Sequence, residues 1–288
     1  MFNGKIMYAS NNDKFEFIHN KQLTKKQKQH YIKIYTGLVK LMQDESRKIG
    51  NNQKKRINVL QDQLISVIQR YPELLYMKYY QYNNAYPNSY HDDHAGSFQL
   101  QLLNYELFEV LENICQDINI CKLEALMGRS LLFLIAPWGN FSTSKDFDEK
   151  RLQLVKTLLK KHPELLTFID QKYNQNLGMY LIGSINDDNQ LADERTQIVK
   201  QFIEHPIASL QQDENGCNLG MYAAHYKNQE LFDIAYQNPK ARVQKNKQGD
   251  TMEMIANNNG LIIPPLTEEQ VYDYYDEEIR KKIDDICR

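Results

Sequence analysis

The five-residue stretch NLGMY occurs twice in this chain, at residues 176–180 and 218–222. The second copy lies inside DENGCNLGMYAA, residues 213–224, where a polar turn ends at Gly216 and a pair of alanines closes the stretch. A third turn, NKQGDTMEMIA, begins at residue 246, and its Gly249 stands 33 residues after Gly216. Recurrence of this kind indicates an internal repeat, and the repeat decides the fold.

Prolines recur at a nearly constant distance before the turns and are a second sign of the repeat. Pro163, Pro206 and Pro239 each follow an expected helix and precede the next turn by 10 or 11 residues. Proline cannot continue a helix, so it suits a position just beyond a helix end. The two signs together predict a repeat of two helices and a turn.

The order of turn, glycine, capping residue, short helix and second helix resembles the ankyrin repeat, whose period is about 33 residues. The resemblance is closest over 213–258, extends through 125–212, and is inferred over 24–124. The family's Thr-Pro-Leu-His is replaced by Asn-Leu-Gly-Met at 218–221. Another helical solenoid, such as tetratricopeptide-like hairpins, is the alternative fold.

The resemblance implies an all-α, ankyrin-like helical-repeat solenoid with capping helices at both ends. We expect three parts: an N-terminal helical region at 1–124, ankyrin-like repeats at 125–260 and a C-terminal capping helix within 261–288. The N-terminal region would hold a short extended lead, with a small hairpin near Lys14–Phe17 or a loosely ordered tail as alternatives, then capping helices and atypical first repeats. Apolar spacing predicts helices over 24–49, 52–71, 97–117, 131–136, 148–161, 176–185, 193–204 and 267–286.

Composition excludes several classes of protein. Lys and Arg number 35 against 37 Asp and Glu, which argues against a general binder of nucleic acid or anionic membranes. We see no signal peptide, and the longest apolar run, 131–138, is far shorter than the roughly 18 residues of a membrane span. Four cysteines in a long chain predict reduced thiols and a cytoplasmic protein.

Residues that could carry chemistry do not form a known catalytic motif. The adjacent ligands of HDDH, residues 91–94, cannot converge on one ion without a special loop, so we expect no metal and no cofactor. Cys217 and His225 could form a nucleophile pair, but the resemblance implies that both are binding side chains. We expect no enzyme. The alternatives are an enzyme with its site in 1–124 and the repeats as a targeting arm, or a structural adaptor.

The resemblance implies a monomeric, non-catalytic interaction module that binds one protein through its turn tips and the exposed face of its first helices. Asn-rich, long-looped units of this kind resemble ankyrin-repeat effectors that intracellular bacteria secrete into host cells without a cleaved signal peptide. The partner would be a host protein or another effector enzyme under its regulation. The matching residues are Arg129, Trp138, Tyr173, Gln175, Ser184, Glu214, Asn215, Cys217, His225, Tyr226, Lys247, Gln248 and Asp250, with Pro137, Lys172 and Asn258 beside them.

Three features leave two interpretations open. Trp138, the single tryptophan, is either a binding hot spot or packs on its own insert. The tyrosine-rich stretch 76–90 is either a second contact surface or core. Four lysines between residues 25 and 33 gather at a helix start, where the helix dipole disfavours cations. They form either a solvated face, which we expect, or a site for an acidic partner.

Overall fold

The computed structural model describes residues 14–17, 24–47, 53–80, 95–97, 102–103, 107–122, 124–126, 129–136, 145–185 and 191–265. The chain forms two compact units, Met1–Ile135 and Ala136–Arg288. The described residues are predominantly helical, as predicted, and short strands accompany the helices of the first unit.

The first unit begins with two long helices that match the predictions for 24–49 and 52–71. These are α1 (Lys25–Arg47) and α2 (Gln53–Arg70). Thr24 starts α1: its Oγ1 accepts a hydrogen bond from the Gln27 amide at 3.3 Å, and Gln27 Oε1 accepts one from the Thr24 amide at 2.9 Å. This reciprocal capping box satisfies two amide groups that the helix itself leaves without partners. The two helices pack on each other.

A three-stranded antiparallel sheet in the first unit corrects two predictions. Its strands are β1 (Lys14–Phe17), β2 (Met77–Tyr80) and β3 (Ala95–Ser97), in the order β1-β2-β3. The local hairpin expected near β1 is wrong, because Lys14 pairs with Tyr80. The single helix expected over 97–117 is also wrong, because Ser97 lies in β3, Leu107 is not helical, and α4 spans only Phe108–Ile114. Strand pairing between distant segments overrides the local helical spacing.

The remaining elements of the first unit are short. They include a 3-10 turn, η1, and two strands that pair antiparallel, β4 and β5. The helix α6 matches the predicted apolar helix at 131–136 except for its last residue, and it is almost wholly buried. In chain order these elements are η1 (Pro72–Tyr76), α5 (Ile118–Lys122), β4 (Glu124–Leu126), β5 (Arg129–Ser130) and α6 (Leu131–Ile135).

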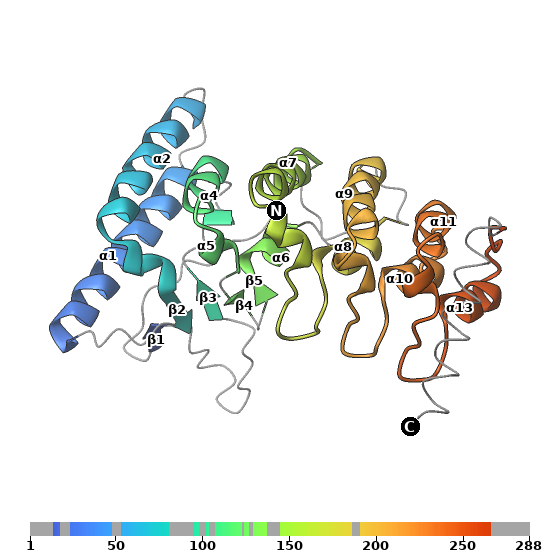
Figure 1. Cartoon of the computed structure of the whole chain (residues 1–288). Coiled ribbons are helices and arrows are strands. Elements are labelled where there is room, and N and C mark those ends of the chain that lie inside the picture. The colour runs from blue at the N-terminus through green and yellow to red at the C-terminus, as the bar shows by residue number, and fades with distance from the viewer. Residues whose placement is uncertain are drawn as a thin grey trace, which may run out of the picture. The chain divides into compact units, whose positions relative to one another are not determined.

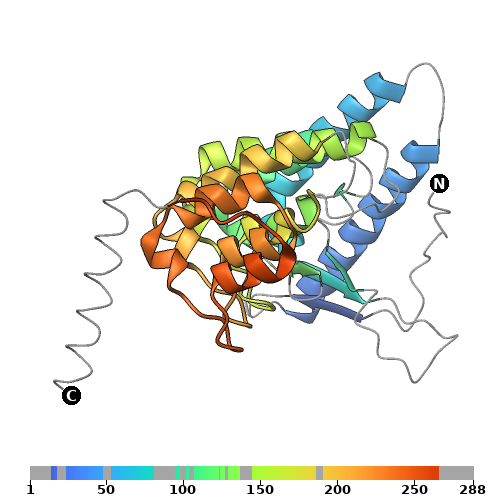
Figure 2. The same ribbon diagram turned by 90° about the vertical axis from the view of Figure 1, so that its right-hand side faces the viewer.

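The second unit repeats a pair of helices, with a long turn before each first helix. Its first helices, α8, α10 and α13, form one layer, and its second helices, α7, α9 and α11, form the other (Figures 1 and 2). Short helical turns, η3, η4 and α12, follow the second helices at the predicted prolines. The bounds are α7 (Lys145–Lys161), η3 (Pro163–Thr167), α8 (Leu177–Ile182), α9 (Ala192–Glu204), η4 (Ala208–Leu210), α10 (Leu219–His225), α11 (Gln229–Tyr236), α12 (Pro239–Arg242) and α13 (Met252–Asn259).

The glycine of NLGMY has the same role in both copies. A Cβ on Gly178 would lie 2.8 Å from Phe202 Cβ, on α9. A Cβ on Gly220 would lie 2.5 Å from Met252 Cε, on α13, and 3.1 Å from Ala235 Cβ, on α11. Each first helix therefore packs against its neighbours so closely that only glycine fits there.

The asparagine of NLGMY begins the first helix and holds it to the chain that follows. Asn176 Oδ1 accepts the Met179 amide, and its Nδ2 donates to Ala208 O at 3.1 Å. Asn218 repeats this geometry with Met221 and with Ala241 O at 2.8 Å. Both asparagines are fully buried. The repeated motif thus supplies both a helix cap and a contact to the following repeat.

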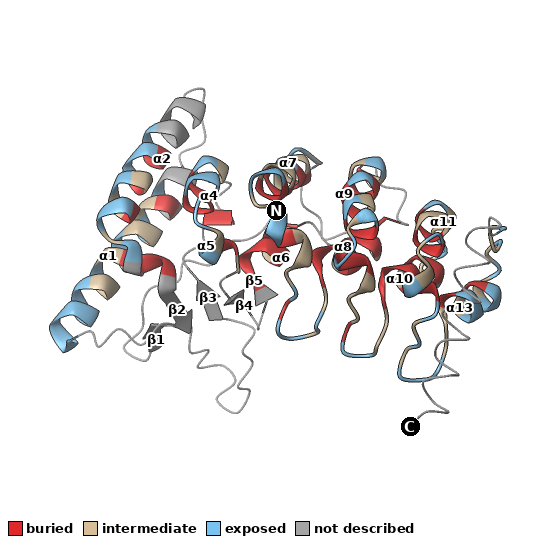
Figure 3. Cartoon of the chain, in the orientation of Figure 1, coloured by how far each residue is buried: buried red, intermediate tan, exposed pale blue. Residues whose placement is uncertain are grey.

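Most buried residues of the second unit lie where the two layers face each other, and the tips of the turns are exposed or half-buried (Figure 3). The predicted closing helix at 267–286 lies outside the described residues, as do Pro137, Trp138, residues 91–94 and most of the tyrosine-rich stretch.

Candidate interaction surface

Three turns in the second unit share one hydrogen-bond pattern. Each starts with Asp or Asn, whose Oδ1 accepts backbone amides further along the turn. Asp213 accepts from the Cys217 amide at 2.7 Å, and Asn246 accepts from the Asp250 amide at 2.8 Å. Asp170 accepts from the Tyr173 amide at 2.7 Å. A side chain that satisfies its own turn's amides fixes the shape of that turn.

A left-handed residue stands at the same place in every turn. Asn174, Gly216 and Gly249 have φ angles of 53°, 79° and 90°. Glycine and asparagine are the residues that adopt this conformation at low cost. This requirement explains the glycines that first marked the repeat, and it explains why asparagine can replace one of them.

Backbone hydrogen bonds join the three turns. The Glu214 amide donates to Tyr173 O at 3.0 Å, and the Lys247 amide donates to Asn215 O at 2.9 Å. Each turn tip is therefore held against the next, and its side chains project from a fixed backbone. We call the row formed by 171–175, 214–217 and 247–250 the turn surface.

The structure places most of the predicted binding residues on or beside the turn surface. Glu214, Asn215, Lys247 and Gln248 are exposed, and so is His225 at the end of α10. The half-buried members are Tyr173, Gln175, Cys217, Tyr226 and Asp250, while Lys172 and Asn258 are exposed.

Ser184 does not belong to this surface, contrary to the prediction. Its side chain is fully buried, and its Oγ donates to Leu181 O at 2.6 Å. Its carbonyl accepts a hydrogen bond from the buried Arg195 at 2.6 Å. The residue closes the end of α8 because the chain turns inward there. Arg129 lies in β5, and its side chain is not described; Trp138 lies outside the described residues.

Tyr222 is a central residue of the surface that the sequence did not single out. Its Oη donates to Asp213 Oδ2 at 2.8 Å and accepts from Gln175 Nε2 at 2.6 Å, so it links two neighbouring turns. Burial, followed by the hydrogen bond and the charge of Asp213, raises the pKa of the Tyr222 phenol. Its position four residues before Tyr226 on one helix face was the signal that could have identified it.

An aromatic group extends the surface along α10. The rings of Tyr222 and Tyr226 are stacked with centroids 6.3 Å apart, and His225 meets Tyr226 edge-on at 5.2 Å. A Cβ on Gly183 would lie 2.9 Å from the Tyr226 hydroxyl, so the glycine at the end of α8 makes room for this side chain. The half-exposed tyrosine is thereby held between two repeats.

Cys217 does not have the properties of an activated nucleophile. Burial, with a smaller contribution from the negative charge of Asp213, raises the pKa of its thiol. A raised pKa reduces the thiolate fraction, and the thiolate is the reactive form.

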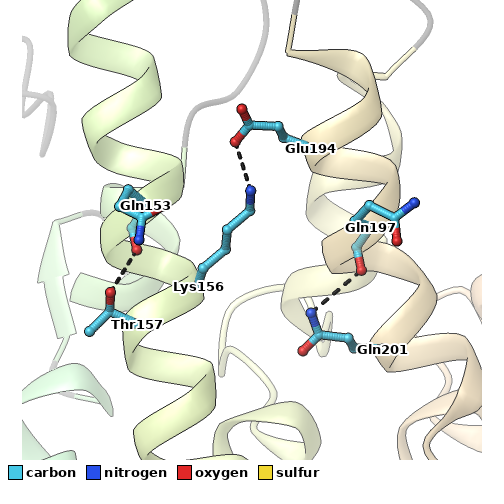
Figure 4. A network of polar contacts seen from close by, with 6 residues as sticks. All are labelled: Gln153, Lys156, Thr157, Glu194, Gln197 and Gln201. Carbon is cyan, nitrogen blue, oxygen red and sulfur yellow. Dashed lines mark hydrogen bonds and ion pairs between the residues drawn. The ribbon is translucent and has the colours of Figure 1, made fainter.

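The second helices present a different, ion-paired surface. Lys156 of α7 lies 2.8 Å from Glu194 of α9, as Figure 4 shows, and Lys200 of α9 pairs with Glu230 of α11. Beside them, Thr157 and Gln201 donate to carbonyls of their own helices. Such half-exposed pairs contribute at most about 1 kcal/mol each. In the described part of the chain, no ion pair involves the charged tips Lys172, Glu214 and Lys247.

The described residues contain no group of three or more His, Cys, Asp or Glu side chains suited to a metal ion. They also contain no helix with the length and apolar character to cross a membrane. No protein-family model matches the chain, and no curated protein matches it.

Proposed function

We propose that the second unit is an ankyrin-like repeat array and that it acts as a non-catalytic module binding one protein partner through the turn surface. The observation that carries this proposal is the backbone ladder from Tyr173 through Glu214 and Asn215 to Lys247. It holds exposed side chains on a fixed backbone, so little conformational entropy is lost when a partner binds.

The chemistry of the exposed tips supports recognition of a charged and partly apolar protein surface. Lys172, Glu214 and Lys247 occupy the same place in successive turns, which gives a row of alternating charge. The stacked pair Tyr222 and Tyr226 adds apolar area with polar ends beside this row. Rigid aromatic side chains of this type dominate binding energy in protein interfaces.

The kind of partner follows from the sequence resemblance alone. On that basis we propose a bacterial effector that acts in a host cell, where it binds a host protein or another effector enzyme.

Affinity capture from host lysate and from the source organism's secreted proteins tests the proposal. The wild type is compared with a double variant, Glu214→Lys with Lys247→Glu, which reverses the charges of two tips. The matched control is Gln197→Lys with Gln201→Glu, which changes the exposed face of α9 by the same net charge. We expect one partner to be retained by the wild type and the control and to be lost by the tip variant.

Two results contradict the proposal. The first is a partner that the tip variant retains at full occupancy, provided that both variants melt with the wild type. The second is the absence of any captured protein together with turnover of a small molecule, which would favour an enzyme with its site in 1–124.

A further inference from the structure

The exposed side of α1 carries a row of lysines with regular spacing. Lys26, Lys33 and Lys40 are all exposed and stand seven residues apart. At about 1.5 Å rise per residue, this spacing places their Cα atoms about 10.5 Å apart along one face. We call these three residues the lysine row. Tyr35 and Met42 point to the opposite side of the helix and are buried.

Within the described residues the lysine row makes no ion pair, and the first acidic residue of α1 is the exposed Asp44, four residues after Lys40. No ion pair within the described residues involves any lysine of α1. The first turn of α1 contains no acidic residue and holds Lys25, Lys26 and Lys28. Cations at the start of a helix are opposed by the helix dipole, so this arrangement weakens the isolated helix and an acidic neighbour would relieve it.

The helix surface between the lysines would allow the backbone of another chain to approach closely. Gly37 lies between Lys33 and Lys40 on the same exposed stripe, and a Cβ built on it would meet nothing within 4 Å. A glycine leaves the helix backbone uncovered, so another backbone can come near it. The stripe also carries the exposed Gln29.

We infer that the lysine row binds an acidic α-helix of a protein partner, one whose carboxylates recur every seven residues. Two helices that lie side by side match charges at this heptad spacing, as the flanking positions of coiled coils do. The inference concerns the first unit and is independent of the proposed function of the turn surface.

Other anionic partners fit these features less well. A helix that binds a membrane surface exposes an apolar face next to its basic one, whereas the buried side chains of α1 pack within the protein. Nucleic-acid surfaces combine cations with exposed aromatic rings or arginine. Between Lys26 and Lys40 the stripe exposes a single aromatic ring, that of His30, and no arginine, so it offers no stacking platform for successive bases.

The test uses the full chain and two synthetic alanine-rich helical peptides of about 20 residues, a length at which isolated helices begin to form. One peptide carries three glutamates at seven-residue spacing. The other carries the same three glutamates at five-residue spacing, which spreads them around the helix. Fluorescence anisotropy at low salt measures both affinities. We expect the first peptide to bind about tenfold more tightly, a preference that added salt removes.

A triple variant, Lys26→Glu with Lys33→Glu and Lys40→Glu, should abolish the preference. Its matched control reverses three exposed lysines of the second unit, Lys160, Lys227 and Lys240, and should keep it. Circular dichroism checks that the triple variant folds. We expect it to fold, because a glutamate near the start of α1 interacts favourably with the helix dipole. Equal binding of the two peptides overturns the inference. So does binding of duplex DNA or phosphatidylserine vesicles that depends on the row while the heptad peptide does not bind.

Discussion

Replacing Asn218 by alanine tests whether the repeated asparagine holds the second unit together. Asn218 is fully buried and makes three hydrogen bonds. Its Oδ1 caps α10 through the Met221 amide, and its Nδ2 donates to Ala241 O and to Gln244 Oε1, each at 2.8 Å. Alanine removes all three, and the Ala241 carbonyl keeps only the 3.3 Å hydrogen bond from the Gln244 amide.

The expected loss follows from these contacts. Loss of a helix cap costs about 1 kcal/mol. Loss of the two hydrogen bonds from Nδ2, to Ala241 O and to Gln244 Oε1, costs a further ~0.5–1.5 kcal/mol each. We therefore expect Asn218→Ala to lower the free energy of unfolding by about 2–4 kcal/mol. Thr251 caps α13 with a single bond of 3.3 Å, so Thr251→Ala should cost only about 0.5–1 kcal/mol.

Urea unfolding followed by circular dichroism gives the free energies. Hydrogen exchange across 213–259 shows whether the loss is local to the second unit, which matters because two units need not unfold together. The variant Asn218→Asp keeps the cap acceptor but sets a carboxylate against Ala241 O, so it should also destabilise the unit. An Asn218→Ala that costs no more than Thr251→Ala would refute this reasoning.

Three further predictions concern single side chains. Gly178→Ala should lower stability by about 1–3 kcal/mol, because its Cβ would lie 2.8 Å from Phe202 Cβ, which cannot move without its backbone; thermal melting measures it, and an unchanged melting temperature contradicts the packing argument. Gly37→Ala should instead raise stability by about 0.5–1 kcal/mol, because α1 has open space there; a destabilised variant would contradict this. Tyr222 has a raised pKa when folded, so the unfolded chain loses this proton first, near its usual pKa of about 10. The wild type should therefore lose stability relative to Tyr222→Phe as pH rises from about 9 to 11; urea titrations that stay parallel would count against the bond to Asp213.

Several features of the second unit could be predicted from the sequence because the same five-residue motif occurs twice. The copies of NLGMY predicted two helix starts, and Asn176 and Asn218 cap α8 and α10 as their residue type favours. Gly216 and Gly249 marked the left-handed turn positions. Helix caps and left-handed turn positions depend on only a few neighbouring residues, so the sequence alone is enough to predict them.

The exposure of the turn tips could be predicted for the same reason. Glu214, Asn215 and Lys247 lie at turn tips, whose exposure follows from the turn pattern. Ser184 was misplaced because its burial depends on Arg195, eleven residues away across a loop. Tyr222 was missed because its role comes from Gln175 of the preceding turn.

The sequence by itself determined the recurrence of NLGMY, the helix starts, the turn glycines and the expected exposure of the turn tips. Each of these is set by backbone geometry and by hydrogen bonds over a few residues. Only the tertiary structure decided that β1 pairs with β2, that neighbouring turns are joined through Tyr173 and Asn215, and that Tyr222 links Gln175 to Asp213. These contacts join residues far apart in the chain, and local propensity carries no information about which distant partner satisfies a given polar group.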